Sequence, residues 1–219
     1  AATYGSVSAV TFITASQFLD QNQITYGGHM AAAMALMESP AIILAVILAS
    51  AAKSNKKQSS LSLLHKSFTD GAQLLLIGAM IVGLFAGATG ERIMAPFSID
   101  LFKGMLAFFL LDMGLMVAKN FKQVLNKPIY VLVYGVFAPP IHALLALLIC
   151  KIAGVDLGET ILLMILSASA SYIAVPAALK YALPQANPSL YFGMSLGLTF
   201  PINIIIGIPL YTYIAKLFF

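Results

Sequence analysis

Two short runs of serine and other small residues interrupt hydrophobic stretches of this chain at matching places. They read Gly5-Ser6-Val7-Ser8-Ala9-Val10-Thr11 and Ser167-Ala168-Ser169-Ala170-Ser171-Tyr172. Each run precedes an apolar segment, a loop and a long apolar helix that has a proline near its middle, Pro40 in the first copy and Pro201 in the second. The prolines lie 161 residues apart, as do matching serines of the two runs, which indicates an internal repeat. Paired interruptions of this kind are typical of the binding sites of membrane carriers.

The chemistry of these runs follows from what a broken helix leaves unpaired inside a bilayer, where backbone N–H and C=O groups need partners in the protein or in a water-filled cavity. Ser8 and Ser171 are predicted N-caps of half-length helices that run to Leu19 and Leu183. The N-terminus of such a helix offers free N–H donors and a partial positive charge, which suit a small anion. Hydroxyls and freed carbonyls beside it suit Na⁺. The alternative interpretation is that the small residues only let helices pack closely.

The candidate site residues follow from this interpretation. The predicted substrate-binding residues all lie in the two interruptions: Gly5, Ser6, Ser8, Thr11, Ser167, Ser169, Ser171 and Tyr172. The predicted Na⁺ ligands combine residues of the interruptions with two residues of the long helices: Ser8, Thr11, Ser169, Thr199 and Glu38. For Tyr172, a hydroxyl that caps the cavity and simple packing both stay open. For Glu38, a place near the ion path and an interhelical hydrogen bond in the protonated form both stay open.

Other polar residues of the apolar stretches are given structural roles. We expect Asp112 and His142 to tie helices together, and Asn203 to bond the backbone that Pro201 frees. The sequence has no zinc pattern, P-loop or nucleophile elbow. Neither Ser8 nor Ser171 has a His or Lys at helical spacing that could act as its base. The chain is therefore not expected to be an enzyme, and no cofactor is expected besides Na⁺ as a coupling ion.

The composition excludes most classes of soluble protein. Hydrophobic residues make up 60% of the 219 residues and charged residues 9%, against about 25% charged in ordinary chains. Several segments reach the length of about 20 apolar residues that a membrane helix needs. The net charge of +4 comes from lysines scattered at helix ends, which does not favour nucleic-acid binding. The predicted fold class is an all-α polytopic membrane protein, built as an inverted-repeat transporter with two discontinuous, crossing helices.

The expected organisation has three parts. Residues 1–52 form the end of a first repeat, with a broken helix followed by a long helix. Residues 53–71 form a lysine-bearing linker, and residues 72–219 form the second repeat with five transmembrane segments. Loops 53–71, 120–127 and 180–187 share one side and hold most of the lysines, so we predict that this side is cytoplasmic in a multi-pass protein of the cell inner membrane.

A family resemblance rests on these same motifs. The segments that carry it are the first serine run, Ile24-Thr25-Tyr26, Met37-Glu38-Ser39-Pro40-Ala41, Ala138-Pro139-Pro140-Ile141-His142, Ser169, Ser171, Ile173 and Pro176, Pro184-Gln185-Ala186-Asn187-Pro188-Ser189, Gly193 and Pro201-Ile202. Together they resemble the sodium-dependent bicarbonate transporters first known from cyanobacteria. Matched position by position, the binding segments of that family fall on Gly5, Ser8, Thr11, Ser169 and Ser171.

The resemblance implies Na⁺–bicarbonate symport by alternating access in a homotrimer, with the anion held between the two broken helices. It also implies that the first helices of the first repeat precede Ala1. Members of the family have a trimeric regulator of the nitrogen-signalling type, and the shortness of Lys53–Asp70 weakens the carry-over of this partner. Two departures are visible: Tyr172 stands where the family pattern has an aspartate, and Lys53–Asp70 replaces a longer acidic insertion. The alternatives are a symporter for another small anion or carboxylate, and a membrane scaffold or sensor that does not transport.

Overall fold

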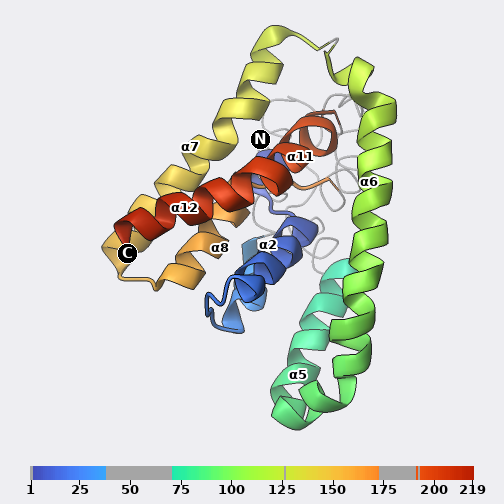
Figure 1. Ribbon diagram of the computed structural model, residues 1–219, viewed down its shortest axis with the longest axis vertical. Helices are drawn as coiled ribbons and strands as arrows, with labels where there is room; N and C mark the ends of the chain where they lie inside the picture. Colours follow the sequence, from blue (N-terminus) through green and yellow to red (C-terminus); the bar gives the residue numbers. More distant parts are fainter. Residues whose placement is uncertain (1, 38–70, 126, 173–190, 192) are drawn as a thin grey trace, which may run out of the picture.

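The computed structural model describes residues 2–37, 71–125, 127–172, 191 and 193–219. These residues form helices joined by short loops and contain no strand, which confirms the all-α fold (Figure 1). Three helical stretches of the described chain are long and apolar enough to cross a membrane: Gly78–Lys119, Ile129–Ala153 and Ser195–Phe218. Glu38, most of the linker 53–71 and the expected half-length helix to Leu183 lie outside the described residues. The inverted arrangement of the two repeats stays a prediction.

The core of the molecule is the packing of α7 (Ile129–Ala153) and α8 (Leu157–Ala168) with α2 (Ala9–Gln21) and α12 (Ile208–Phe218). In Figure 1 these helices lie together on one side of the structure. Helix α8 is central, because its residues from Thr160 to Leu166 are almost all fully buried. Its apolar side chains pack with Leu19 of α2 and Ile208 of α12 in one cluster. Burial on this scale fixes α8 as the element against which the others are placed.

Local sequence signals set the ends of α7 and α8. Helix α7 starts after Pro128, whose fixed φ and missing N–H suit a helix start, and it ends at Gly154 with a φ of 69°. The first turn of α8 meets the loop after α2, where a Cβ at Gly158 would overlap the carbonyl oxygen of Thr25. Beside it, the Gly27 N–H donates to Glu159 Oε1 at 2.8 Å. This close approach fixes where the α2 loop joins the start of α8.

The last membrane stretch is not a regular α-helix. It runs from η2 (Ser195–Thr199) through α11 (Phe200–Ile202) and η3 (Asn203–Gly207) into α12. The two wide π turns flank Pro201, which lacks the N–H that a regular helix would use at that point. Gly207 lets the Asn203 side chain lie against the helix, since a Cβ there would come within 2.8 Å of Asn203 Oδ1. The proline thus shapes the segment that faces the second interruption.

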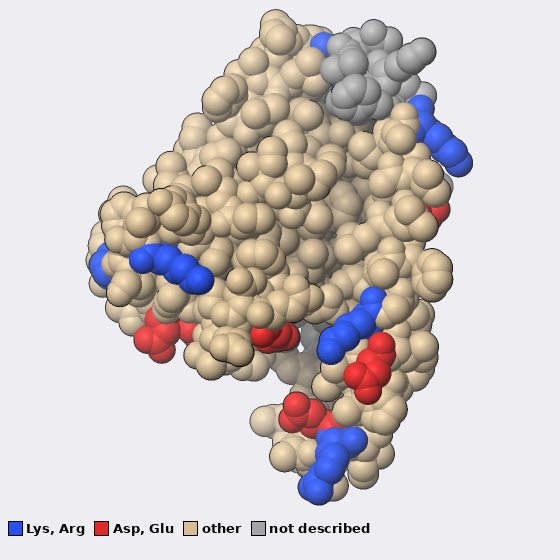
Figure 2. All heavy atoms as spheres, in the orientation of Figure 1, with Lys and Arg blue, Asp and Glu red and all other residues tan. Residues whose placement is uncertain are grey.

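Helices α5 (Gly71–Ala95) and α6 (Phe102–Leu125), joined by η1 (Pro96–Leu101), form an arm beside this core (Figure 1). The sequence predicts a loop at 88–96; instead the chain breaks at Gly87, with a φ of 55°, and stays helical from there to Leu101. Many large apolar side chains of the arm are exposed, including Phe85 and Phe108. Figure 2 accordingly shows a surface of mostly uncharged residues with scattered charged side chains. Such a surface fits contact with lipid or with further membrane helices.

One structural expectation for the arm is wrong. Asp112 lies exposed on α6 and makes no hydrogen bond or ion pair with the described residues, so it does not tie helices together in this part of the chain. The reason is the rotation of α6, which turns Met113 rather than Asp112 into a small cluster with Tyr172 and Phe200. Sequence periodicity gives no fixed rotation for a helix that is apolar on most sides.

Candidate functional site

The first interruption separates α1 (Ala2–Gly5) from α2. Ser8 is the N-cap of α2, as predicted: its backbone is extended and its Oγ accepts a hydrogen bond from the Thr11 N–H at 3.2 Å. The Ser8 carbonyl accepts the first bond of the helix, from the Phe12 N–H at 3.0 Å. The chain therefore changes direction over three residues and restarts a helix inside the protein, because Ser8 and Thr11 are both buried.

The second interruption follows α8, which ends at Ala168. Ser169 is the C-cap, with an extended backbone, and its hydroxyl donates to the Leu166 carbonyl at 2.7 Å. The Ala168 carbonyl accepts from Asn203 Nδ2 at 2.7 Å. Both carbonyls at this buried helix end are thus satisfied by side chains. The bond to Ala168 corrects the expectation that Asn203 serves the backbone around Pro201.

The two interruptions meet directly. The Ser8 N–H donates to Ser169 Oγ at 2.9 Å, across the 161 residues that separate matching positions of the repeat. A second contact joins the same segments, because the Ser171 N–H donates to the Thr3 carbonyl at 2.9 Å. All four residues are buried. Two segments that are far apart in the sequence therefore supply each other's backbone partners inside the protein.

The start of α2 keeps free donors at this meeting point. The N–H groups of Ala9 and Val10, in the first turn of the helix, have no partner among the described residues. The Tyr172 side chain packs in a cluster that Val10 joins, and it lies near the Ser8 side chain. The Tyr172 hydroxyl is buried, since the residue is only 5% exposed, and although the Ser8 side chain lies close to it, it makes no hydrogen bond of good geometry in the described chain. The first turn of α2 thus keeps backbone donors without described partners, and the Tyr172 side chain packs beside that turn.

Two hydrogen bonds connect Tyr4, next to the first interruption, to Thr199 and on to the backbone of α7. Pro139 has no N–H, so it leaves the carbonyl of Gly135 without its partner in the helix. Thr199 Oγ1 donates to that carbonyl at 3.1 Å, and because its one hydrogen is then used, Tyr4 Oη must donate to Thr199 at 2.6 Å. Gly135 permits this approach, since a Cβ there would lie 2.7 Å from Leu198 Cδ2. The Thr199 hydroxyl thus replaces the helix hydrogen bond that Pro139 cannot make, and the Tyr4 hydroxyl bonds Thr199 in turn.

The predicted Na⁺ ligands divide into two places. Ser8, Thr11 and Ser169 lie together at the meeting point of the interruptions. Thr199 instead bonds Tyr4 and Gly135, and no described contact joins it to the serines. Glu38 lies outside the described residues. Of the predicted ligands, Ser8, Thr11 and Ser169 therefore share one place, and Thr199 belongs to another.

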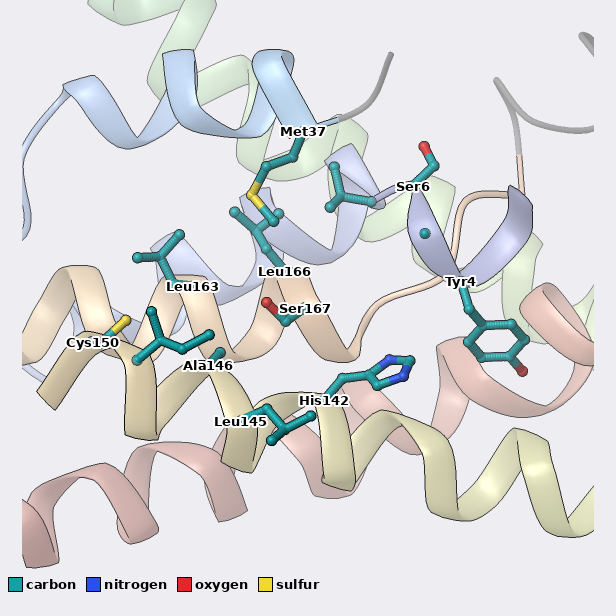
Figure 3. A pocket seen from close by; sticks show the side chains of 13 residues that line it. Tyr4, Ser6, Met37, His142, Leu145, Ala146, Cys150, Leu163, Leu166 and Ser167 are labelled. Carbon is teal, nitrogen blue, oxygen red and sulfur yellow. The ribbon is translucent and has the colours of Figure 1, made fainter. Parts of the chain in front are cut away.

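The remaining predicted residues lie on another face of the interruptions. Gly5, Ser6 and Ser167 line a cavity of about 410 Å³ between α1, α7 and α8 (Figure 3). His142 of α7 lines the same cavity. Sequence reasoning gave His142 a helix-tying role and did not single out Tyr4. The only signal for Tyr4 was its place one turn before Ser8, which is weak without knowledge of Thr199.

Comparisons with known proteins identify the family of the chain. No curated protein matches the chain. A family model described as the Na⁺-dependent bicarbonate transporter superfamily matches residues 1–216, which is nearly the whole sequence. The buried, mutually bonded interruptions and the long apolar helices are the features expected of a membrane transporter. The chain therefore belongs to the Na⁺-dependent bicarbonate transporter superfamily.

Proposed function

We propose that the protein imports bicarbonate together with Na⁺ by alternating access, with the anion held at the start of α2 where the two interruptions meet. The observation that carries the proposal is the Tyr172 hydroxyl, buried beside Ser8 and Val10 without a partner in the described chain. A buried unsatisfied hydroxyl costs about 1–3 kcal/mol, so a site that keeps one is expected to use it. An oxyanion bound there satisfies it.

The groups around Tyr172 match the needs of bicarbonate. Its three oxygen atoms accept hydrogen bonds, and the site offers donors from the Ala9 and Val10 N–H groups in addition to the phenol. The N-terminus of α2 adds a partial positive charge, which favours an anion even though no Lys or Arg occurs in either interruption.

The same meeting point supports a role for Na⁺. The hydroxyl oxygens of Ser8 and Ser169 lie at this meeting point, where each accepts a bond from a backbone N–H, and Thr11 stands in the first turn of α2 beside them. A cation there would offset the charge of the anion in a site of low polarity, which couples the binding of the two ions. In this proposal, alternating access moves the elements around the pair of interruptions while the ions stay between them.

Uptake of labelled bicarbonate into proteoliposomes, with and without an inward Na⁺ gradient, tests the proposal. Tyr172→Phe removes only the hydroxyl. Loss of one bond to a charged ligand, worth about 1.5–3 kcal/mol, should raise the KM for bicarbonate roughly tenfold to a hundredfold. Tyr213→Phe is the matched control, because Tyr213 is 63% exposed on α12, and it should leave KM unchanged. Uptake that does not depend on Na⁺, or equal KM values in both variants, would refute the proposal.

A further inference from the structure

The cavity on the α7 side of the interruptions differs in its residues from the proposed anion site. Its polar lining comes from Tyr4, Ser6, His142 and Ser167, and its apolar lining includes Leu145, Ile149 and Leu163. A volume of about 410 Å³ and a mostly apolar wall with a few polar groups are typical of small-molecule sites. Figure 3 shows the imidazole of His142 projecting from α7 toward Tyr4, with Ser167 on the neighbouring α8.

Two polar side chains of this cavity make no hydrogen bond with the described residues. His142 and Ser167 are both half-buried, and neither makes a hydrogen bond with any residue that the structure describes. An ionisable side chain in the membrane part of a protein faces a partner or a water-filled cavity as a rule. His142 has no partner on another helix in the described structure, so the cavity is the place that its position serves.

The cavity also reaches both interruptions. Its lining includes Gly5, Ser6 and Val7 of the first and Leu166 and Ser167 at the start of the second. Ser8, which caps α2, is the next residue after Val7, and Ser169 is two residues after Ser167. A ligand in this cavity would therefore be separated from the proposed anion site by the interruptions themselves. In the proposed cycle, the elements around these interruptions move and open the way between the cavity and the site.

We infer that this cavity is the vestibule from which bicarbonate enters the proposed site, and that His142 and Ser167 bind the anion there before it passes the interruptions. The inference rests on the proposed function, whose site it extends. An imidazole with one N–H carries one donor and one acceptor. His142 can therefore donate to an anion oxygen, while water or the hydroxyl of bicarbonate donates to its other nitrogen. The Ser167 hydroxyl supplies a second donor from the facing helix.

Substitutions at His142 separate binding from packing. His142→Leu removes the donor and should raise the KM for bicarbonate about tenfold or more, while His142→Gln keeps an N–H donor and should stay within about threefold of the parent. His29→Leu is the matched control, because His29 is exposed and does not line the cavity; its KM should not change. Equal KM values in His142→Leu and the parent would overturn the inference.

A labelling experiment gives a readout that does not depend on transport. In a Cys150→Ala background, which removes the one native thiol, Ser167→Cys should react with a negatively charged methanethiosulfonate, and bicarbonate should slow the reaction. Ser98→Cys, exposed on η1, should react at a rate that bicarbonate does not change. Reaction of Ser167→Cys with an uncharged maleimide but not with the anionic reagent would show a lipid-filled groove and overturn the inference.

The two proposals fail in different ways. Protection of Ser167→Cys by bicarbonate in a protein without Na⁺-dependent uptake would refute the symport and support the anion-binding cavity. Na⁺-dependent uptake by the parent, with no protection and no effect of His142→Leu, would support the symport and refute the vestibule.

Discussion

Ser8 and Ser169 occupy matching positions of the repeat that the sequence predicts, yet their hydroxyls serve opposite ends of helices. Ser8 Oγ accepts a bond from the N–H of Thr11, at the start of α2. Ser169 Oγ donates a bond to the carbonyl of Leu166, at the end of α8. A hydroxyl can do either, because it is both donor and acceptor. The contrast shows that both serine-rich runs contain a helix end, while the direction of each helix decides whether N–H or C=O groups are left unpaired there.

The sharpest test of this contrast is Ser169→Ala. The substitution removes the bond to Leu166 and leaves the buried Ser8 N–H unpaired, which costs about 1–3 kcal/mol for the unpaired donor alone. Thermal unfolding in detergent should show a lower Tm, by roughly 2–4 °C per kcal/mol for a chain of this size. Ser98→Ala, whose hydroxyl bonds a helix carbonyl on the exposed η1, is the control and should leave Tm within about 1 °C. An unchanged Tm in Ser169→Ala would mean that the two interruptions do not depend on each other.

Asn203→Leu tests the second interruption alone. Asn203 is 1% exposed, and its loss leaves the Ala168 carbonyl buried without the side-chain donor, at a cost of about 1–3 kcal/mol that the added apolar surface partly offsets. The matched control is Asn22→Leu, which removes a bond from an amide to a helix carbonyl of the same kind at an exposed site. Thermal unfolding should separate the two variants by several degrees. A similar Tm for both would show that the C-terminal end of α8 does not need its amide cap.

Ser8→Ala should have the smallest effect of the three on stability. Loss of an N-cap typically costs about 1 kcal/mol, and Ser8→Gly should cost only a few tenths, because glycine adopts the cap conformation and leaves room for water. The Ser8 N–H keeps its bond to Ser169 in both variants, so the contact between the interruptions survives. If Ser8→Ala destabilises the protein as much as Ser169→Ala, the two hydroxyls play equal parts and the contrast drawn above is wrong.

Much of the site could be predicted from the sequence because its signals are local. A serine directly before an apolar run predicts an N-cap, and Ser8 confirms it. Runs of small residues inside apolar stretches predict breaks: the first run holds the break between α1 and α2, and α8 ends within the second run. The all-α class follows from the density of apolar residues and the length of the segments. The family resemblance also stands, since the matching family model spans residues 1–216.

The rest depends on how helices are rotated and which ones lie side by side. Asn203 was paired with the wrong backbone because its true partner, Ala168, is 35 residues away and comes near only after α8 and η3 pack. His142 was expected to bond another helix, but its ring faces a cavity. The hydrophobic period of a helix as apolar as α7 does not say which side is inside. The sequence does not mark Gly87 as the place where the helix breaks, because glycine is common inside membrane helices and does not by itself end one.

The bond between Tyr4 and Thr199 has a consequence for the order in which the protein is assembled. The two residues are separated by 195 positions, so the segment that carries Tyr4 leaves the ribosome long before its partner is made. Until then the polar groups of the first interruption have neither Thr199 nor the residues after α8 as hydrogen-bond partners. A short polar segment without these partners inserts poorly into lipid. Completion of the fold therefore waits for the last membrane helix, and truncation before that helix should leave the first interruption unformed and exposed to proteolysis.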